Sequence, residues 1–227
     1  MEEKEISEQE SLQLITEMIR KAKGNFHETG ISSILWGSVI AVCGLVSFAQ
    51  MQWNFSVGFD VWLLALAAII PQVFITIRES RQRTVLTHNQ SVLNHVWMVY
   101  GISIFALVFY FNIVPGVTDK ILAQQGSIIS QQDKETGLLK PFQYFIASSG
   151  SLLLMLYAIP TLITGLTYAF KPMLAGAIIC YLFFALSLFT ETKWDMLFNG
   201  LAAIGNWLIP GLLLRRRFYL QKGALDV

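Results

Sequence analysis

The chain has 227 residues, of which 54% are hydrophobic and 14% are charged, and its mean hydropathy is +0.54. A soluble globular domain carries about 25% charged residues, so this composition argues against a soluble protein and predicts an integral membrane protein. The formal net charge of +1 offers no basic surface for nucleic acid, and we expect no nucleic-acid partner. Both cysteines fall inside apolar segments, where we interpret them as small hydrophobic residues, so no cofactor or metal is predicted.

The first 30 residues predict a cytoplasmic amphipathic helix followed by a linker. Within "ISEQESLQLITEMIRKAKG", Ser7 and Glu10 have the spacing of a capping box, and Gly24 can end the helix in a left-handed conformation. One apolar stripe runs along this helix, and its main residues are Leu12, Ile15 and Ile19. Such a helix can lie among lipid headgroups, pack under the membrane domain or receive a partner protein; we favour the first two.

Residues 31–214 predict an all-α membrane domain. Six segments approach the roughly 20 apolar residues that cross a bilayer as a helix, and they are residues 31–50, 60–77, 95–114, 142–168, 173–190 and 195–214. An even number of spans places both termini on the same side. The longest connection, residues 115–141, lies on the opposite side and is either a functional lid or a mobile loop.

The distribution of Lys and Arg predicts which side is cytoplasmic. Twelve of the 16 basic residues lie on the side of the termini, and the other four are Lys120, Lys134, Lys140 and Lys193. This excess places both termini in the cytoplasm, together with a basic tail at 215–227. The loop after the second span lies on the same side, and with the stripe of the N-terminal helix it forms a candidate partner surface through Arg78, Arg81 and Arg83.

Proline follows isoleucine in or near the inner halves of the second, fourth and sixth spans, at Pro71, Pro160 and Pro210. One interpretation is a threefold repeat of helical hairpins, since transporters can carry internal repeats. Membrane helices also tolerate proline without any functional role. We favour this simpler interpretation because the helices that precede the prolines share no matching pattern.

The stretch "YAIPTLITGLTYAFKP" contains the main candidate for a local site. Pro160 cannot donate a hydrogen bond to the carbonyl one turn earlier, so it bends the helix, and Thr161 and Thr164 can bond to carbonyls of their own helix. Gly165 allows a neighbouring helix to approach closely. We favour a kinked helix that ends in a tight hairpin, and a substrate groove on the kink is the alternative.

Uncharged polar residues inside the spans are expected to form hydrogen bonds between helices, and they are Gln72, Asn112, Asn199 and Asn206. Asn206, one turn before Pro210, is the best further candidate for a polar lining. The span centres carry no charged residue, so ion-coupled transport lacks its usual groups. Ionisable residues are expected at helix ends, where water can reach them, and they are Asp60, His95 and Asp195.

Three stretches together resemble a family of uncharacterised bacterial multi-pass membrane proteins, and they are "ESLQLITEMIRKAKGNFHETGISSILWG", "PTLITGLTYAFKPMLAGAIIC" and "WLIPGLLLRR". Members of this group are often encoded beside a small winged-helix transcription regulator. The resemblance covers most of the chain and brings no known activity or functional residues. It implies a location in the bacterial cytoplasmic membrane and a sensing or regulatory role.

Two functional hypotheses follow. The first is a non-enzymatic sensing, regulatory or accessory protein that acts through a cytoplasmic or membrane protein partner, with a homo-oligomer as a further candidate assembly. The second is a small transporter or channel for an apolar or uncharged solute, with the three proline kinks around a central path. The sequence contains no enzyme motif, so a lipid-modifying enzyme is a less favoured third hypothesis, with its candidate groups at Asp60, Glu191 and Asp195.

Overall fold

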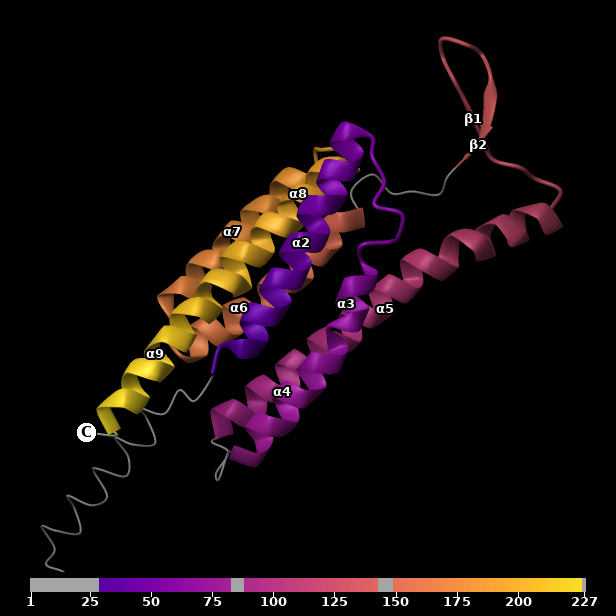
Figure 1. The fold of residues 1–227 in the computed structure, drawn as a ribbon. Coiled ribbons are helices and arrows are strands. Elements are labelled where there is room, and N and C mark those ends of the chain that lie inside the picture. Colours follow the sequence, from indigo (N-terminus) through magenta and orange to yellow (C-terminus); the bar gives the residue numbers. More distant parts are fainter. Residues whose placement is uncertain (1–28, 83–87, 143–148, 226–227) are drawn as a thin grey trace, which may run out of the picture.

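The computed structural model describes residues 29–82, 88–142 and 149–225, and these are mostly helical (Figure 1). In chain order the elements are α2 (Ile31–Trp53), α3 (Leu63–Ala67), α4 (Ile69–Gln82), α5 (His88–Gln124), β1 (Ser130–Gln132), β2 (Leu139–Pro141), α6 (Ser149–Thr167), α7 (Lys171–Ser187), α8 (Thr192–Ala203), the π-helical turn η1 (Ile204–Leu208) and α9 (Ile209–Leu225). The amphipathic helix predicted at the N-terminus lies outside the described residues.

Among the described residues, five helical stretches are long and apolar enough to cross a membrane. They are Ile31–Trp53, Leu63–Arg81, His88–Gln124, Gly150–Thr167 and Thr192–Leu220. The last of these joins α8, η1 and α9 into one continuous rod. α7 is a shorter apolar helix of 17 residues. The predicted helical architecture is therefore confirmed, and its long helices have the length and composition of membrane spans.

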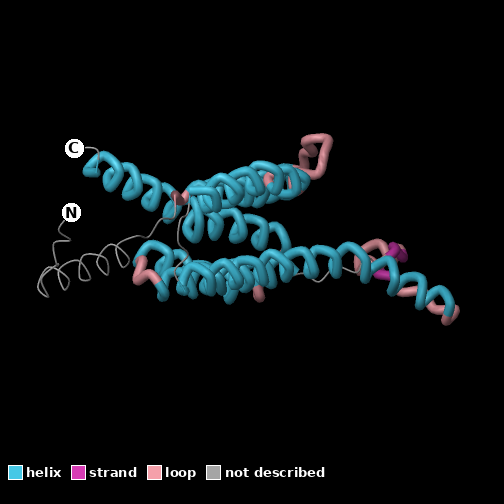
Figure 2. The backbone as a smooth tube through the Cα atoms, turned by 90° about the horizontal axis from the view of Figure 1, so that it is seen from below, coloured by secondary structure: helices cyan, strands magenta, loops and turns pink. Residues whose placement is uncertain are grey.

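The helices form two parts that lie side by side (Figures 1 and 2). One part is a bundle of α2, α6, α7 and the α8–η1–α9 rod, and the other is an arm of α3, α4 and α5. The core lies in the bundle, and its largest buried side chains include Ile40, Leu154, Tyr157 and Trp207. The arm meets the bundle most extensively where α5 touches α6. In the most apolar stretch of α5, however, no residue is buried.

Glycines bring α2 against the α8–η1–α9 rod. Gly30, Gly37 and Gly44 recur every seven residues, so they lie on one side of α2 and of the turn before it. A Cβ built on Gly37 would lie 2.5 Å from the nitrogen of Leu208, and one on Gly44 would lie 2.6 Å from the nitrogen of Gly200. The two antiparallel rods therefore touch through their main chains, which fixes their register.

The second predicted span is divided into α3 and α4 at Ala68. Pro71 has no N–H for the carbonyl of Ala67, which explains why α3 ends there. The chain continues as a helix at once because Ala68 donates to the carbonyl of Leu64 and accepts from the N–H of Gln72. The predicted kink at the first of the three prolines is thus a short break in an otherwise continuous span.

The third predicted span continues beyond its expected end, as far as Gln124. Pro115 lies inside this helix, so the proline does not stop it. The end comes at Gly126, which has a φ of 69°, and the N–H of Ser127 bonds to the carbonyl of Leu122 at 2.9 Å, a glycine-dependent helix end. β1 and β2 then form an antiparallel hairpin. The predicted all-α class therefore holds for the bundle and the arm but not for the connection between α5 and α6, which contains this hairpin.

Candidate functional site

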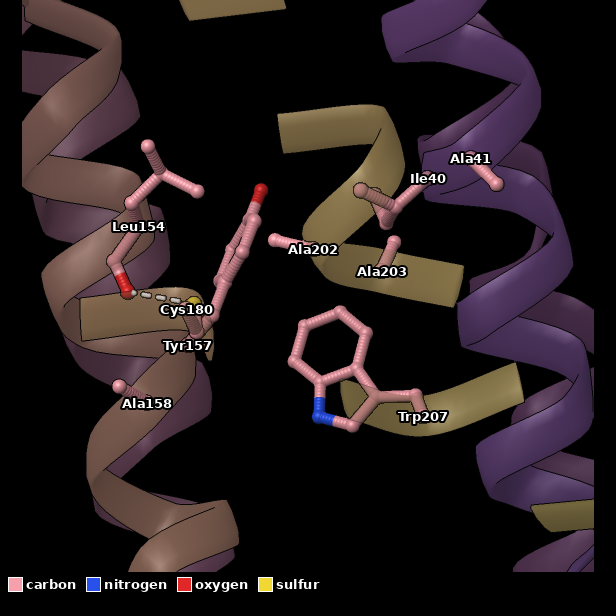
Figure 3. Close-up of a cluster of buried hydrophobic side chains, with 9 residues drawn as sticks. All are labelled: Ile40, Ala41, Leu154, Tyr157, Ala158, Cys180, Ala202, Ala203 and Trp207. Carbon is pink, nitrogen blue, oxygen red and sulfur yellow. Dashed lines mark hydrogen bonds between the residues drawn. The ribbon is translucent and has the colours of Figure 1, made fainter. Parts of the chain in front are cut away.

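An aromatic and polar cluster occupies the bundle core beside the proline of α6. The rings of Tyr157 of α6 and Trp207 of η1 have centroids 4.8 Å apart (Figure 3). Tyr100 of α5 meets both rings edge-on. The thiol of Cys180 donates to the carbonyl of Leu154 at 3.2 Å in the same cluster (Figure 3). This cluster joins α5, α6, α7 and η1.

The hydroxyl of Thr161 is the centre of a hydrogen-bond network between α6 and η1. It accepts from Nε1–H of Trp207 at 2.9 Å and from Nδ2–H of Asn206 at 3.0 Å. The same hydroxyl donates to the carbonyl of Tyr157 at 3.1 Å, and Asn206 donates to that carbonyl at 2.9 Å. Thr161 and Asn206 are fully buried, so these bonds form where water cannot replace them.

Two prolines account for the backbone geometry behind this network. Pro160 lies inside α6 and lacks the N–H that would bond to the carbonyl of Leu156, one turn earlier. On the facing rod, Pro210 cannot donate to the carbonyl of Asn206, and its ring would clash there. The N–H of Ile209 bonds instead to the carbonyl of Ile204, five residues earlier. This π-helical turn allows the amide and the neighbouring indole to reach the same threonine on α6.

Thr164 connects α6 to the arm. Its hydroxyl accepts from Nε1–H of Trp97 of α5 at 3.2 Å and donates to the carbonyl of Pro160 at 2.7 Å. One position further, a Cβ built on Gly165 would lie 3.0 Å from Cδ2 of Leu174, so α7 passes close to α6. The predicted close neighbour and tight hairpin are therefore present in the structure, and α6 continues as a helix through Pro160.

Asp195 belongs to a second polar group, near the start of α6. It lies in the first turn of α8 and is fully buried, so the expectation that water reaches it at the helix end is wrong. Neither carboxylate oxygen has a well-formed hydrogen bond with a described residue. Gly150 lies beside this side chain, since a Cβ built on the glycine would lie 2.8 Å from Cβ and 3.2 Å from Oδ2 of Asp195. The start of α6 packs over the first turn of α8 and excludes solvent from the carboxylate.

Asn199 lies one turn after Asp195 and connects α8 to α6. Its Nδ2 donates to the carbonyl of Gly150 at 3.2 Å and to that of Asp195 at 2.8 Å. The side-chain oxygens of Asn199 and Asn206 have no hydrogen-bond donor among the described residues. The rod thus carries a row of buried acceptors toward α6. Because such groups are costly to bury without donors, they are the feature of the bundle that packing alone does not explain.

The predicted site residues fall into separate places. Thr161 on α6 bonds to Asn206 on the rod, and each of these residues lies next to or one turn from a proline, Pro160 or Pro210. Further along α6, Thr164 contacts Trp97 and Gly165 lies close to Leu174. Pro71, Arg78 and Arg81 are exposed on α4. The remaining predicted residues lie outside the described part of the chain, and they are Leu12, Ile15, Ile19 and Arg83.

The four polar residues expected to bond between helices behave differently. Asn199 and Asn206 bond to α6, as described above, and Gln72 of α4 accepts from Nε1–H of Trp36 of α2 at 3.1 Å. Asn112 instead donates to the carbonyl of Val108 in its own helix at 2.8 Å. The prediction is therefore confirmed for three of these residues and is wrong within this chain for Asn112.

In the part of the chain that the structure describes, no group of three or more His, Cys, Asp or Glu side chains is placed to hold a metal ion. Comparison of the chain with known protein families, with curated proteins and with solved structures finds no match. Function is therefore inferred from the residues and their geometry.

Proposed function

We propose that the protein is a non-enzymatic membrane protein that senses or regulates through a protein partner. In this proposal it lies in the bacterial cytoplasmic membrane with six spans and both termini in the cytoplasm. α7 counts as a span because its 17 residues are at the lower end of the length that crosses a bilayer. The excess of Lys and Arg on the side of the termini supports the orientation.

The main support for this proposal is the difference in burial between the helices of the bundle and those of the arm. Half of the residues in the apolar stretch of α6 are buried, against 6% for the α3–α4 stretch and none for the most apolar part of α5. The polar groups of the bundle core are enclosed, and the side-chain N–H groups of Asn199, Asn206 and Trp207 bond to α6, which suits a structural role. The arm, in contrast, presents uncovered helices, and α4 ends with the exposed cations Arg78 and Arg81.

The proposed contact surface is the cytoplasmic end of α4 together with the apolar stripe of the N-terminal segment. A partner with an acidic rim around an apolar groove would suit both the cations and the predicted stripe, because charge then sets the orientation of binding and apolar burial supplies most of the affinity.

The test is purification of the tagged full-length protein from its own membranes in a mild detergent, followed by mass spectrometry of proteins that remain bound in stoichiometric amounts. A double variant, Arg78→Glu with Arg81→Glu, is expected to lose such a partner. The matched control is Lys134→Glu, a charge reversal on the exposed hairpin of β1 and β2, and it is expected to retain the partner. Purification of the chain without any stoichiometric partner would contradict the proposal.

A second candidate function is a small transporter or channel for an apolar or uncharged solute. The observation in its favour is the π-helical turn opposite Pro160, because π turns often mark functional sites and the Asn206 oxygen there has no donor among the described residues. Release of glycerol and of a lipophilic dye from proteoliposomes tests it. Asn206→Leu should slow release if this region forms a path, whereas release no faster than from protein-free liposomes would exclude it for these solutes.

A further inference from the structure

Asn112 is an exposed amide on an apolar helix. No charged residue lies between His95 and Asp119, so α5 is uncharged on both sides of it. One N–H of the amide donates to the carbonyl of Val108 at 2.8 Å. The second N–H and the side-chain oxygen have no partner in the described structure. Lipid tails cannot supply hydrogen bonds, so such an amide favours contact with another protein helix.

Gly101 and Gly116 lie on the same side of α5 as this amide. A Cβ built on either glycine would meet nothing within 4 Å. In the bundle, by contrast, helical glycines such as Gly44 and Gly176 touch the main chain of a neighbouring helix. Glycine weakens a helix relative to alanine, and the described structure contains no close packing that explains glycine at these two positions.

These residues form one face of α5 with Phe105 and Val108 between them. Gly101, Phe105, Val108, Asn112 and Gly116 follow one another at steps of four, three, four and four residues, which keeps all five on one side of a helix. Phe105 is 47% exposed and Val108 is 43% exposed. We call this surface the Asn112 face. Of the α5 residues that pack against the bundle core, Tyr100 and Ile104 lie roughly 80–120° around the helix from the centre of this face, and Trp97 lies one turn before Gly101.

We propose that the Asn112 face is a contact with a second copy of this chain. Two copies inserted in the same orientation are related by a twofold axis along the membrane normal, so α5 meets its copy in parallel and each residue meets its own counterpart at the same depth. An amide carries both donors and an acceptor, so Asn112 is complementary to itself. Gly116, four residues after Asn112, has no side chain and therefore allows the two helices to approach closely where they cross. This inference does not depend on the proposed function.

Disulfide cross-linking in native membranes tests the geometry. The two natural cysteines, Cys43 and Cys180, are buried, so the wild-type chain should give little background. Val108→Cys places a thiol on the Asn112 face, and Val99→Cys places one nine residues away, half a turn around the same helix. Both valines are exposed, at 43% and 58%. Mild oxidation should give a covalent dimer with Val108→Cys and little with Val99→Cys. Equal cross-linking at the two positions, or none at either, would overturn the proposal.

Energy transfer between labelled full-length copies in lipid vesicles, measured as the ratio of protein to lipid is varied, tests the affinity. Asn112→Leu should raise the dissociation constant roughly three- to tenfold, and Asn112→Gln, which keeps the amide, should raise it less. Gly116→Leu fills space that meets nothing in this chain, so the fold should be unchanged by circular dichroism while association falls. A chain that is monomeric at every ratio, or a dimer unaffected by Asn112→Leu and Gly116→Leu, would refute the contact.

Discussion

Gly44 of α2 and Gly200 of α8 meet through their main chains. A Cβ built on Gly44 would lie 2.6 Å from the nitrogen and 2.8 Å from the Cα of Gly200. These distances are shorter than a Cβ can tolerate, and no side-chain rotation relieves them because the opposing atoms are backbone. The separation of α2 and α8 therefore depends on glycine at this point.

Gly44→Ala should lower the free energy of unfolding by about 1–3 kcal/mol, because the added methyl group forces the two helices apart. Reversible unfolding by sodium dodecyl sulfate in mixed micelles measures the change. Gly205→Ala is the matched control, since its methyl group meets open space and it lies outside the Asn112 face, and it should leave stability unchanged or raise it by about 0.5–1 kcal/mol. If both variants unfolded at the same detergent fraction, the close α2–α8 contact would be refuted.

Thr161→Val removes the oxygen that accepts from Asn206 and Trp207. Because both donors are buried, we expect a loss of about 1–3 kcal/mol in the free energy of unfolding. Thr167→Val is the control: the hydroxyl of Thr167 is exposed and donates only to the carbonyl of Ile163 in its own helix, so the loss there should be at most about 0.5 kcal/mol. The same unfolding assay compares the two, and equal losses would mean that the Thr161 network contributes little.

Features of the fold with local causes could be predicted from the sequence. The close approach at Gly165 follows from the chemistry of a single residue, and apolar length predicts the long helices. The burial of Asp195 could not be predicted, because it depends on how the start of α6 packs over α8. The sequence also places the end of the third span at residue 114, whereas α5 continues through Pro115 as far as Gln124, before the glycine end at Gly126.

The candidate site was also predictable only in part. Asn206 stood out because an amide inside an apolar span needs a hydrogen-bond partner. Its partner Thr161 lies 45 residues away in the chain, and no spacing rule connects residues on different helices. The seven-residue repeat of glycines in α2 was visible in the sequence, and it would have indicated the face of α2 that meets the rod.

Gln72→Leu should loosen the arm and leave the bundle intact. Gln72 accepts from Trp36 at 3.1 Å and donates to Ser32 at 3.1 Å, so it ties α4 to the start of α2. The arm has few buried residues to compensate for this loss. Amide hydrogen exchange should rise about fivefold in α4, as expected for about 1 kcal/mol, and stay constant in α6. Thr76→Val, which loses a bond within α4 alone, is the control, and uniform changes in α4 and α6 would contradict the prediction.

Asp195→Asn tests the most unusual group of the bundle. The carboxylate is fully buried without a well-formed hydrogen bond, and asparagine keeps its shape while removing the charge that is costly to bury. We expect the free energy of unfolding to rise by about 1–2 kcal/mol at neutral pH.

Glu191→Gln is the control for this substitution. Its side chain is 80% exposed and pairs at 3.5 Å with Lys193, so its effect should stay within about 0.5 kcal/mol. A stability gain for Asp195→Asn accompanied by loss of partner binding or of solute release would mean that the carboxylate is retained for function at the expense of stability. A stability loss would contradict the prediction, and it would mean that the main chain at the start of α6 stabilises the carboxylate.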